Sequence, residues 1–162
     1  MNAQQLHDYI IKPTLEYMGH GYDSKNARML LLATAAIESD CGHYIKQING
    51  PALGVWQMEP DTFHDIYANC DALKKAGLQR RVNDLAIKGE GIDAAWLISS
   101  PMYACAVARL KYSMDKAPIP DHKEIFEVYR YYKRIYNTPI GASTFDKFKS
   151  SWLKCGLDKI VL

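Results

Sequence analysis

The sequence has no Cys-x-x-Cys pair and no cluster of histidines, so it lacks the ligand spacings that are typical of a metal site. Its five histidines are dispersed along the chain, and nothing in it indicates a bound metal ion or another cofactor. The four cysteines are also widely separated, at Cys41, Cys70, Cys105 and Cys155. We expect them to be reduced core residues, and one disulfide is the alternative that the sequence leaves open.

Long hydrophobic runs are lacking as well. The longest, from Met29 to Ile37, has about half of the roughly 20 residues that cross a bilayer, so we expect no stable insertion into a membrane. The N-terminus, Met1 to Asp8, has neither the basic start nor the apolar core of a signal peptide. We therefore expect synthesis in the cytoplasm, and work outside the cell would need another route of export.

An excess of charge of one sign is also missing. The 20 Lys and Arg residues against 18 Asp and Glu residues give a formal net charge of +2, which is too small to indicate a nucleic-acid-binding protein. A chain of 162 residues fits one domain and can bury about two thirds of its unfolded surface. Repeats and low-complexity tracts are absent and alternating strands are scarce. We therefore predict a single, mainly α domain over residues 1–162.

Helical periodicity is what the sequence does contain. The first predicted helix covers residues 3–18, with a kink or break at Pro13. Its expected core contacts are Leu6, Tyr9, Ile10, Leu15 and Met18. Further helices are predicted from a cap at Asp23 or Ser24 to Glu38, over 62–67 with Asp61 as the cap, and over 101–113, 123–136 and 145–153. Residues 42–53 are predicted to be irregular, and the charged stretch 73–83 to be a solvated face or loop.

One carboxylate stands out at the end of the second predicted helix. The residues from Leu31 to Ile37 offer almost no polar face, so we expect Glu38 to project into a protein interior or a cleft. Burial disfavours its charged form, and the carbonyl end of a helix repels an anion. Both effects raise the pKa of Glu38 towards the range that a general acid needs near neutral pH.

The residues around and after Glu38 carry a resemblance. Glu38-Ser39 at a helix end, then a segment from Ala52 to Met58, then Pro60 and Thr62, resembles the catalytic core of soluble lytic transglycosylases. That family shares its fold with goose-type lysozymes. A Tyr136-Asn137 pair stands where the family has Ala-Tyr-Asn-x-Gly. The helix with Ala104, Ala106, Arg109 and Leu110 resembles the one that packs behind the family's site.

The resemblance covers roughly residues 24–140 and has departures. The family has Gly where Pro51 stands and Leu or Met where Trp56 stands. The segment around Tyr136 and Asn137 lacks the family's preceding Ala and its later Gly. These changes leave the acid in place and affect the detailed shape of the groove. The resemblance implies a lysozyme-like single domain of the transglycosylase type with little β structure.

The reaction that the resemblance implies is cleavage of the MurNAc–GlcNAc β-1,4 bond of peptidoglycan. Glu38 acts first as acid and then as base. The muramic acid 6-hydroxyl attacks and leaves a 1,6-anhydro end, so the reaction needs no second carboxylate. The nearby acids Asp40, Glu59, Asp61 and Asp65 have no spacing that singles one out. A hydrolytic lysozyme that uses a second carboxylate is one alternative. A catalytically silent glycan-binding or structural virion module is another.

The residues that we expect to bind substrate are Ser39, Trp56, Gln57, Met58, Tyr136 and Asn137. Several of them have a structural alternative. Ser39 would cap the helix end, Met58 and Trp56 would lie in the core, and Asn137 would end a helix. Gly54 is expected to meet a backbone requirement beside the groove.

The tyrosines between Tyr129 and Tyr136 are expected in the core because helical spacing explains them. The interleaved Arg130, Lys133 and Arg134 give nucleic-acid binding as a third hypothesis, which the small net charge disfavours. The short chain and the absence of a signal peptide favour a bacteriophage endolysin or virion-associated enzyme. We expect such a protein to be made in the host cytoplasm and to act as a monomer on the glycan strands of the cell wall.

Overall fold

The computed structural model describes residues 1–75, 77–86, 92–138 and 141–162, and in these ranges the chain is mainly helical, as predicted. The α-helices are α1 (Ala3–Leu6), α2 (Lys12–Met18), α3 (Lys25–Ser39), α4 (Pro60–Asn69), α5 (Leu78–Asp84), α6 (Trp96–Ser99), α7 (Pro101–Ser113), α8 (Ile125–Tyr132) and α9 (Phe145–Lys154). Turns of π-helix lie at His7–Ile11 and Lys133–Asn137, and 3₁₀ turns at Asp71–Lys74 and Leu157–Lys159. The β structure of the described ranges is limited to the isolated bridges Lys46–Leu53 and Leu53–Met58.

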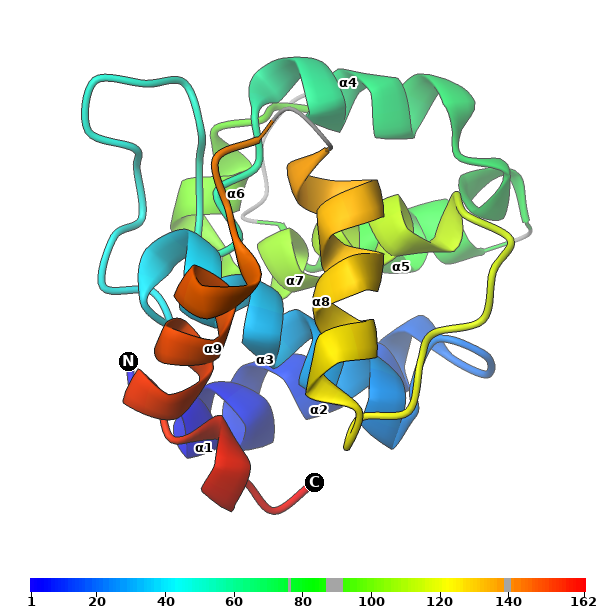
Figure 1. Cartoon of the computed structure of the whole chain (residues 1–162). Helices are drawn as coiled ribbons and strands as arrows, with labels where there is room; N and C mark the ends of the chain where they lie inside the picture. Colours follow the sequence, from blue (N-terminus) through cyan, green and yellow to red (C-terminus); the bar gives the residue numbers. More distant parts are fainter. Residues whose placement is uncertain (76, 87–91, 139–140) are drawn as a thin grey trace.

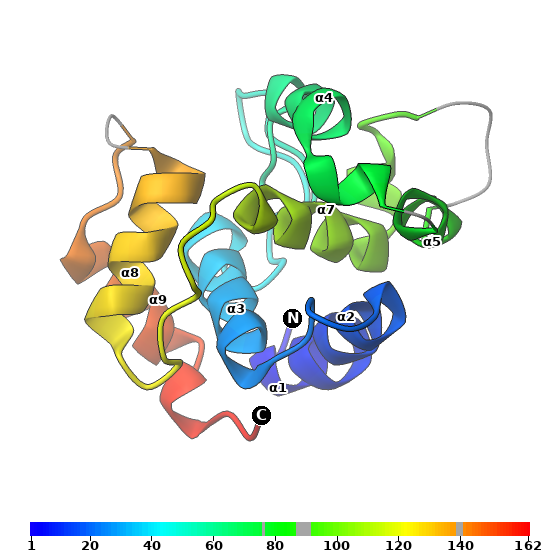
Figure 2. The same ribbon diagram turned by 90° about the vertical axis from the view of Figure 1, so that its right-hand side faces the viewer.

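Helix α3 lies at the centre of the molecule. Helices α7, α8 and α9 pack against it, and in Figure 2 α1 and α2 lie below α7 and beside the lower part of α3. Figure 1 shows the same arrangement from the side, with the loop between α3 and α4 extending beyond the helices. Every side chain of α3 from Met29 to Ala36 is buried. A helix that is apolar on all sides has to be surrounded by other elements, and this explains the central position of α3.

The first predicted helix is interrupted by the π-helical turn ahead of Pro13. Proline has no N–H to donate, and the Lys12 N–H bonds to the His7 carbonyl five residues back. The wider turn shifts the buried face, so His7 and Ile11 are buried while Tyr9 is 71% exposed. The prediction for Tyr9 was therefore wrong. The other predicted contacts are correct, since Leu6, Leu15 and Met18 are buried and Ile10 packs against the core.

Helix α3 begins and ends close to the predicted positions. The Ser24 Oγ accepts a hydrogen bond from the Ala27 N–H at 3.0 Å, so Ser24 is the cap. The helix ends at Ser39, and the next three residues all have left-handed φ angles, 54° at Asp40, 53° at Cys41 and 79° at Gly42. The chain therefore turns sharply away just after Glu38, and the end of α3 faces the loop that follows.

Other helix boundaries differ from the prediction. Helix α4 begins at Pro60, because proline fits the first helical position, so Glu59 is its cap residue and Asp61 lies within the first turn. The stretch 73–83, predicted as a solvated face or loop, contains most of α5. Leu78 and Val82 form the buried face of α5. They lie four residues apart in an otherwise polar segment. Helix α8 begins at Ile125 and passes into a π-helical turn at Lys133.

The four cysteines are free thiols, as predicted. Cys41, Cys70 and Cys105 are buried, and Cys155 is half-buried. In the described ranges no group of three or more His, Cys, Asp or Glu side chains is arranged to hold a metal ion. None of the helices in those ranges combines the length and the apolar character that a membrane crossing needs.

Candidate active site

Glu38 lies where two adjoining pockets meet at the C-terminal end of α3. One pocket has a volume of about 240 Å³ and the other of about 490 Å³. Both are lined by Glu38, Gln57, Glu59, Asn137 and Thr138, so they form one depression that we call the Glu38 groove. Its remaining lining residues are Met58, Thr62, Lys111 and Tyr136 in the first pocket and Gln47, Ala52 and Gly141 in the second.

The Glu38 carboxyl group is shielded from water and held by one phenol. Burial raises the pKa of Glu38, and this is the larger influence on it. The Tyr132 hydroxyl donates a hydrogen bond to Glu38 Oε1 at 2.6 Å, which favours the carboxylate and offsets part of the rise. The net direction is upward, as expected from the sequence. The carboxyl group thus has the environment of a proton donor.

A stack of tyrosines forms the wall behind Glu38. The ring of Tyr136 lies 5.4 Å from that of Tyr112 and 6.3 Å from that of Tyr132, with interplanar angles of 28° and 22°. The Tyr112 hydroxyl is hydrogen-bonded to Thr34 Oγ1 of α3 at 2.6 Å. Burial, together with the nearby Glu38 charge, raises the pKa of all three phenols, so they stay neutral. A wall of neutral groups offers the Glu38 carboxylate no counter-charge.

Replacement of Tyr132 by phenylalanine is expected to raise the pKa of Glu38 further, because the lost hydrogen bond favours the charged form. If Glu38 is a general acid, the alkaline limb of the pH–activity profile should move to higher pH. The direct measurement is an NMR titration of the Glu38 carboxyl carbon in both proteins. Tyr17→Phe, at a half-exposed position outside the groove, serves as the control. An unchanged titration curve in the Tyr132 variant would contradict this prediction.

Gln57 and Met58 reach the groove from a tight turn. Gly54 has a φ of +74°, and a Cβ at this position would lie 2.3 Å from the Leu97 carbonyl oxygen, so the turn requires glycine. Gln57 follows with a φ of +45°, and its side-chain amide donates to the Gly54 carbonyl at 2.8 Å. Met58 is buried but lines the first pocket. The structure therefore places both predicted residues beside Glu38.

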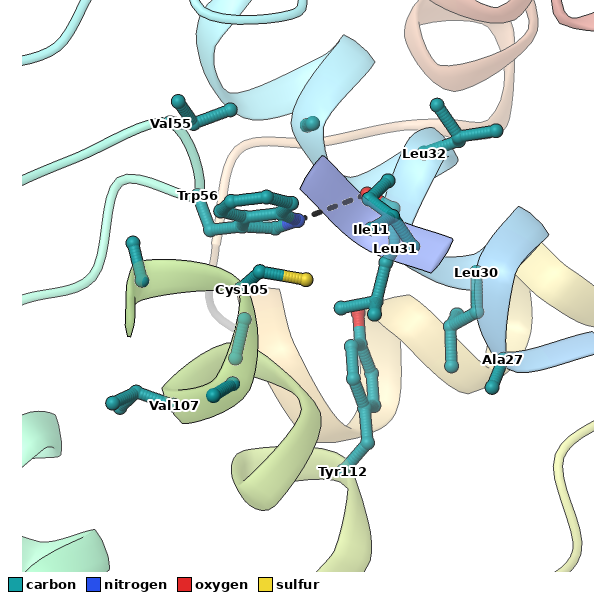
Figure 3. Close-up of a cluster of buried hydrophobic side chains, with 14 of the residues drawn as sticks. Ile11, Ala27, Leu30, Leu31, Leu32, Val55, Trp56, Cys105, Val107 and Tyr112 are labelled. Atoms are coloured by element: carbon teal, nitrogen blue, oxygen red, sulfur yellow. Dashed lines mark hydrogen bonds between the residues drawn. The ribbon is translucent and has the colours of Figure 1, made fainter. Parts of the chain in front are cut away.

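Ser39 and Trp56 do not line the groove. Each is 1% exposed. Side-chain hydrogen bonds of both residues connect α3 to the loop that follows it. The Ser39 Oγ donates to the Val55 carbonyl and accepts the Gly42 N–H at 2.8 Å. The Trp56 indole N–H donates to the Leu31 carbonyl at 2.9 Å, with Cys105 among the apolar neighbours that Figure 3 shows. Trp56 therefore lies in the core, which is its structural alternative, and Ser39 is buried at the end of α3, so contact of either residue with substrate stays a prediction that the pocket lining does not support.

Tyr136 and Asn137 line the groove from the π-helical turn that follows α8. The Tyr136 hydroxyl donates to the Trp56 carbonyl at 2.8 Å, which fixes the loop that carries Gln57. The Asn137 side-chain oxygen, Oδ1, accepts a hydrogen bond from Lys133 Nζ at 2.9 Å. Asn137 lines both pockets of the groove. These two predicted residues therefore line the same groove as Glu38, although almost a hundred residues of sequence separate them from it.

Sequence reasoning did not single out Glu59 or Lys111. Of the four acids near Glu38 in sequence, Glu59 lines both pockets, whereas Asp40 pairs with Lys154 Nζ at 2.5 Å and lies outside them. Asp61 does not line the groove either. The available signal for Glu59 was its position directly before Pro60, which fixes it as the cap residue next to Met58.

The basic residues of α8 and of the π-helical turn after it are mostly paired. Arg130 lies 3.3 Å from a Glu127 oxygen, and Arg134 forms an ion pair with Asp115. Lys133 is hydrogen-bonded to Asn137. This pairing leaves little positive charge for a nucleic-acid backbone, so the structure adds no support to that hypothesis.

Comparison of the chain with protein-family models, with curated proteins and with solved structures found no match. The function therefore has to be inferred from the chemistry of the Glu38 groove. That groove combines a carboxyl group of raised pKa with the amides of Gln57 and Asn137 and the ammonium group of Lys111. Such a set can protonate an oxygen of a polar ligand and hold its amide or hydroxyl groups.

Proposed function

We propose that this chain is a peptidoglycan lytic transglycosylase with a lysozyme-like fold, which cleaves the MurNAc–GlcNAc β-1,4 bond. The observation that carries the proposal is the shielded Glu38 carboxyl group, with its raised pKa, at the centre of a groove. Cleavage of a glycosidic bond needs a proton on the leaving oxygen, and an acid of raised pKa keeps its proton to higher pH than an exposed glutamate does. The resemblance of Glu38-Ser39 and of the segment from Gly54 to Thr62 supports this assignment.

In the proposed reaction, Glu38 gives its proton to the glycosidic oxygen as the bond to the sugar C1 breaks. The Tyr132 hydrogen bond stabilises the carboxylate that results. That carboxylate then takes the proton of the muramic acid 6-hydroxyl, whose oxygen bonds to C1 and closes the 1,6-anhydro ring. Asn137 and Lys111 line the first pocket. In this reaction the Asn137 amide would hold an N-acetyl group, and the Lys111 ammonium group would attract the carboxylates of the muramyl peptide.

The direct test is digestion of purified peptidoglycan, followed by mass spectrometry of the soluble fragments. We expect 1,6-anhydromuramic ends, which are lighter by one water molecule than reducing ends. Fragments that carry reducing ends alone would exclude the transglycosylase. Failure to release any fragment, from protein shown to be folded, would exclude an enzyme and leave the silent virion module. Action on the cell wall as a bacteriophage enzyme belongs to the same proposal.

A hydrolytic lysozyme is the second candidate, and the position of Glu59 favours it. Glu59 is the second carboxylate that lines the groove in the described ranges. Hydrolases that invert or retain the anomeric centre place their two carboxyl groups at about 5 to 10 Å. In this reaction Glu59 would activate water or stabilise the oxocarbenium ion.

Replacement of Glu59 by glutamine separates the two candidates. For a transglycosylase we expect activity within about tenfold of wild type and unchanged anhydro products, because the sugar supplies its own nucleophile. For a hydrolase, loss of the second carboxylate should lower the rate by about 10²-fold or more. Asp61→Asn, two residues further along the chain and outside the groove, is the matched control. The rates come from the initial clearing of a peptidoglycan suspension.

A further inference from the structure

Arg109 of α7 is a buried cation that has no carboxylate partner in the described ranges. Its residue is 8% exposed. Its Nε donates to the Tyr22 carbonyl at 3.0 Å, its Nη2 donates to the Gly21 carbonyl at 3.3 Å, and the guanidinium lies 5.5 Å from the centre of the Tyr22 ring. A guanidinium carries five N–H donors, so these two bonds leave most of its donor capacity unused.

Arg109 lines a pocket of about 450 Å³ that shares no residue with the Glu38 groove. Lys75 and Lys116, both exposed at the surface, line the same pocket, as does His20. One acid, Asp71, is among its described lining residues. The pocket is therefore lined by one buried guanidinium group and two exposed lysines.

Asp71 does not neutralise Arg109. Its side chain is 90% exposed and bonds to Lys74 Nζ at 2.7 Å, so it is already paired at the surface. The described ion pairs of the chain do not include Arg109. Burial without a counter-ion lowers the pKa of Arg109, although a guanidinium stays charged at neutral pH. Two carbonyl oxygens and one ring face compensate a buried charge only in part.

We propose that this pocket, here called the Arg109 pocket, binds inorganic phosphate or a phosphate monoester. An anion with several oxygens would accept the remaining N–H donors of Arg109 in the paired geometry that guanidinium groups favour. A phosphate dianion also matches the combined charge of Arg109, Lys75 and Lys116 better than a single carboxylate does. The volume of the pocket suits a small phosphorylated group. This site is independent of Glu38 and of any glycan cleavage.

Titration calorimetry with inorganic phosphate at constant ionic strength tests the proposal. We expect saturable binding to the wild-type protein and a matching rise in melting temperature. Lys75→Gln/Lys116→Gln changes exposed residues only, so it should fold and bind phosphate at least about tenfold more weakly. The matched control is Lys12→Gln/Lys159→Gln, which removes the same charge at exposed positions elsewhere. Arg109→Gln, checked for folding by circular dichroism, should abolish binding.

Three results would overturn the proposal. The first is no saturable binding to the wild type, and the second is an equal loss of affinity in the two double-lysine variants, which would indicate general charge attraction. The third concerns charge, because a dianion should bind best. If the monoanions acetate or a glycerol phosphodiester bind as tightly as phosphate and glycerol 3-phosphate do, the proposal fails. All readouts are binding, so none of these results depends on whether the protein cleaves peptidoglycan.

Discussion

Replacement of Glu38 by glutamine is expected to slow the cleavage of peptidoglycan about 10²- to 10⁴-fold, the range that a general acid contributes. Glutamine has the size of glutamate and can still accept the hydrogen bond from Tyr132, but it has no carboxyl proton to donate. The wall of the groove should therefore keep its shape while the chemistry is lost. The measurement is the initial clearing rate of a peptidoglycan suspension.

The control for this variant is Glu124→Gln, at an exposed position that lies outside the Glu38 groove. It changes the same functional group and the same net charge, and it should clear the suspension at the wild-type rate. Full activity in the Glu38 variant would mean that another residue donates the proton. Equal losses in the two variants would point to charge and not to catalysis as the cause.

The Glu38→Gln variant should also be more stable against unfolding than the wild type at neutral pH. The pKa of Glu38 is higher in the folded protein than its ordinary value of 4.5, so the folded state binds the proton more tightly than the unfolded chain does. The stability linked to Glu38 is therefore complete at pH below 4.5 and is lost as pH rises through the folded-state pKa. Glutamine is neutral at every pH. The melting temperature of the Glu38→Gln variant should therefore exceed that of the wild type at neutral pH, and the difference should shrink in acid.

The position of Glu38 could be predicted because it depends on local sequence. A cap at Ser24, an apolar run and a stop after Ser39 all lie within one helix, and each has a signal in the chain itself. The failure at Tyr9 has a different origin. One π-helical turn before Pro13 changes which side chains face the core, and a helical period of 3.6 residues does not represent that change.

The groove itself depended on contacts between distant residues. Tyr132 lies 94 residues from Glu38 in the chain, and its helical spacing indicated only a core tyrosine. The carboxylates near Glu38 in sequence could not be ranked until α4 placed Glu59 in the groove and Asp61 outside it. The motif from Gly54 to Met58 could be recognised as a unit. Which of its side chains face the groove was decided by packing against α3.

Replacement of Trp56 by alanine is expected to lower the free energy of unfolding by about 3–5 kcal/mol. Trp56 is among the largest fully buried side chains, and its removal would leave a cavity and an unmatched hydrogen bond at Leu31. This loss is a large part of the roughly 5–15 kcal/mol that holds a typical domain together. The measurement is urea unfolding followed by circular dichroism, because the substitution also removes a fluorophore.

The same substitution should also loosen the Glu38 groove. The Trp56 carbonyl accepts the Tyr136 hydroxyl at 2.8 Å, so a displaced Trp56 backbone would loosen the contact between Tyr136 and the loop that carries Gln57. Trp56→Phe keeps most of the apolar volume and should lose less stability, about 1–3 kcal/mol for the smaller ring and the missing donor. Trp96→Ala, at a half-buried position, is the second comparison and should lose less than Trp56→Ala. A loss below about 1 kcal/mol for Trp56→Ala is typical of a surface position and would contradict the anchoring role that its burial and its bond to α3 indicate.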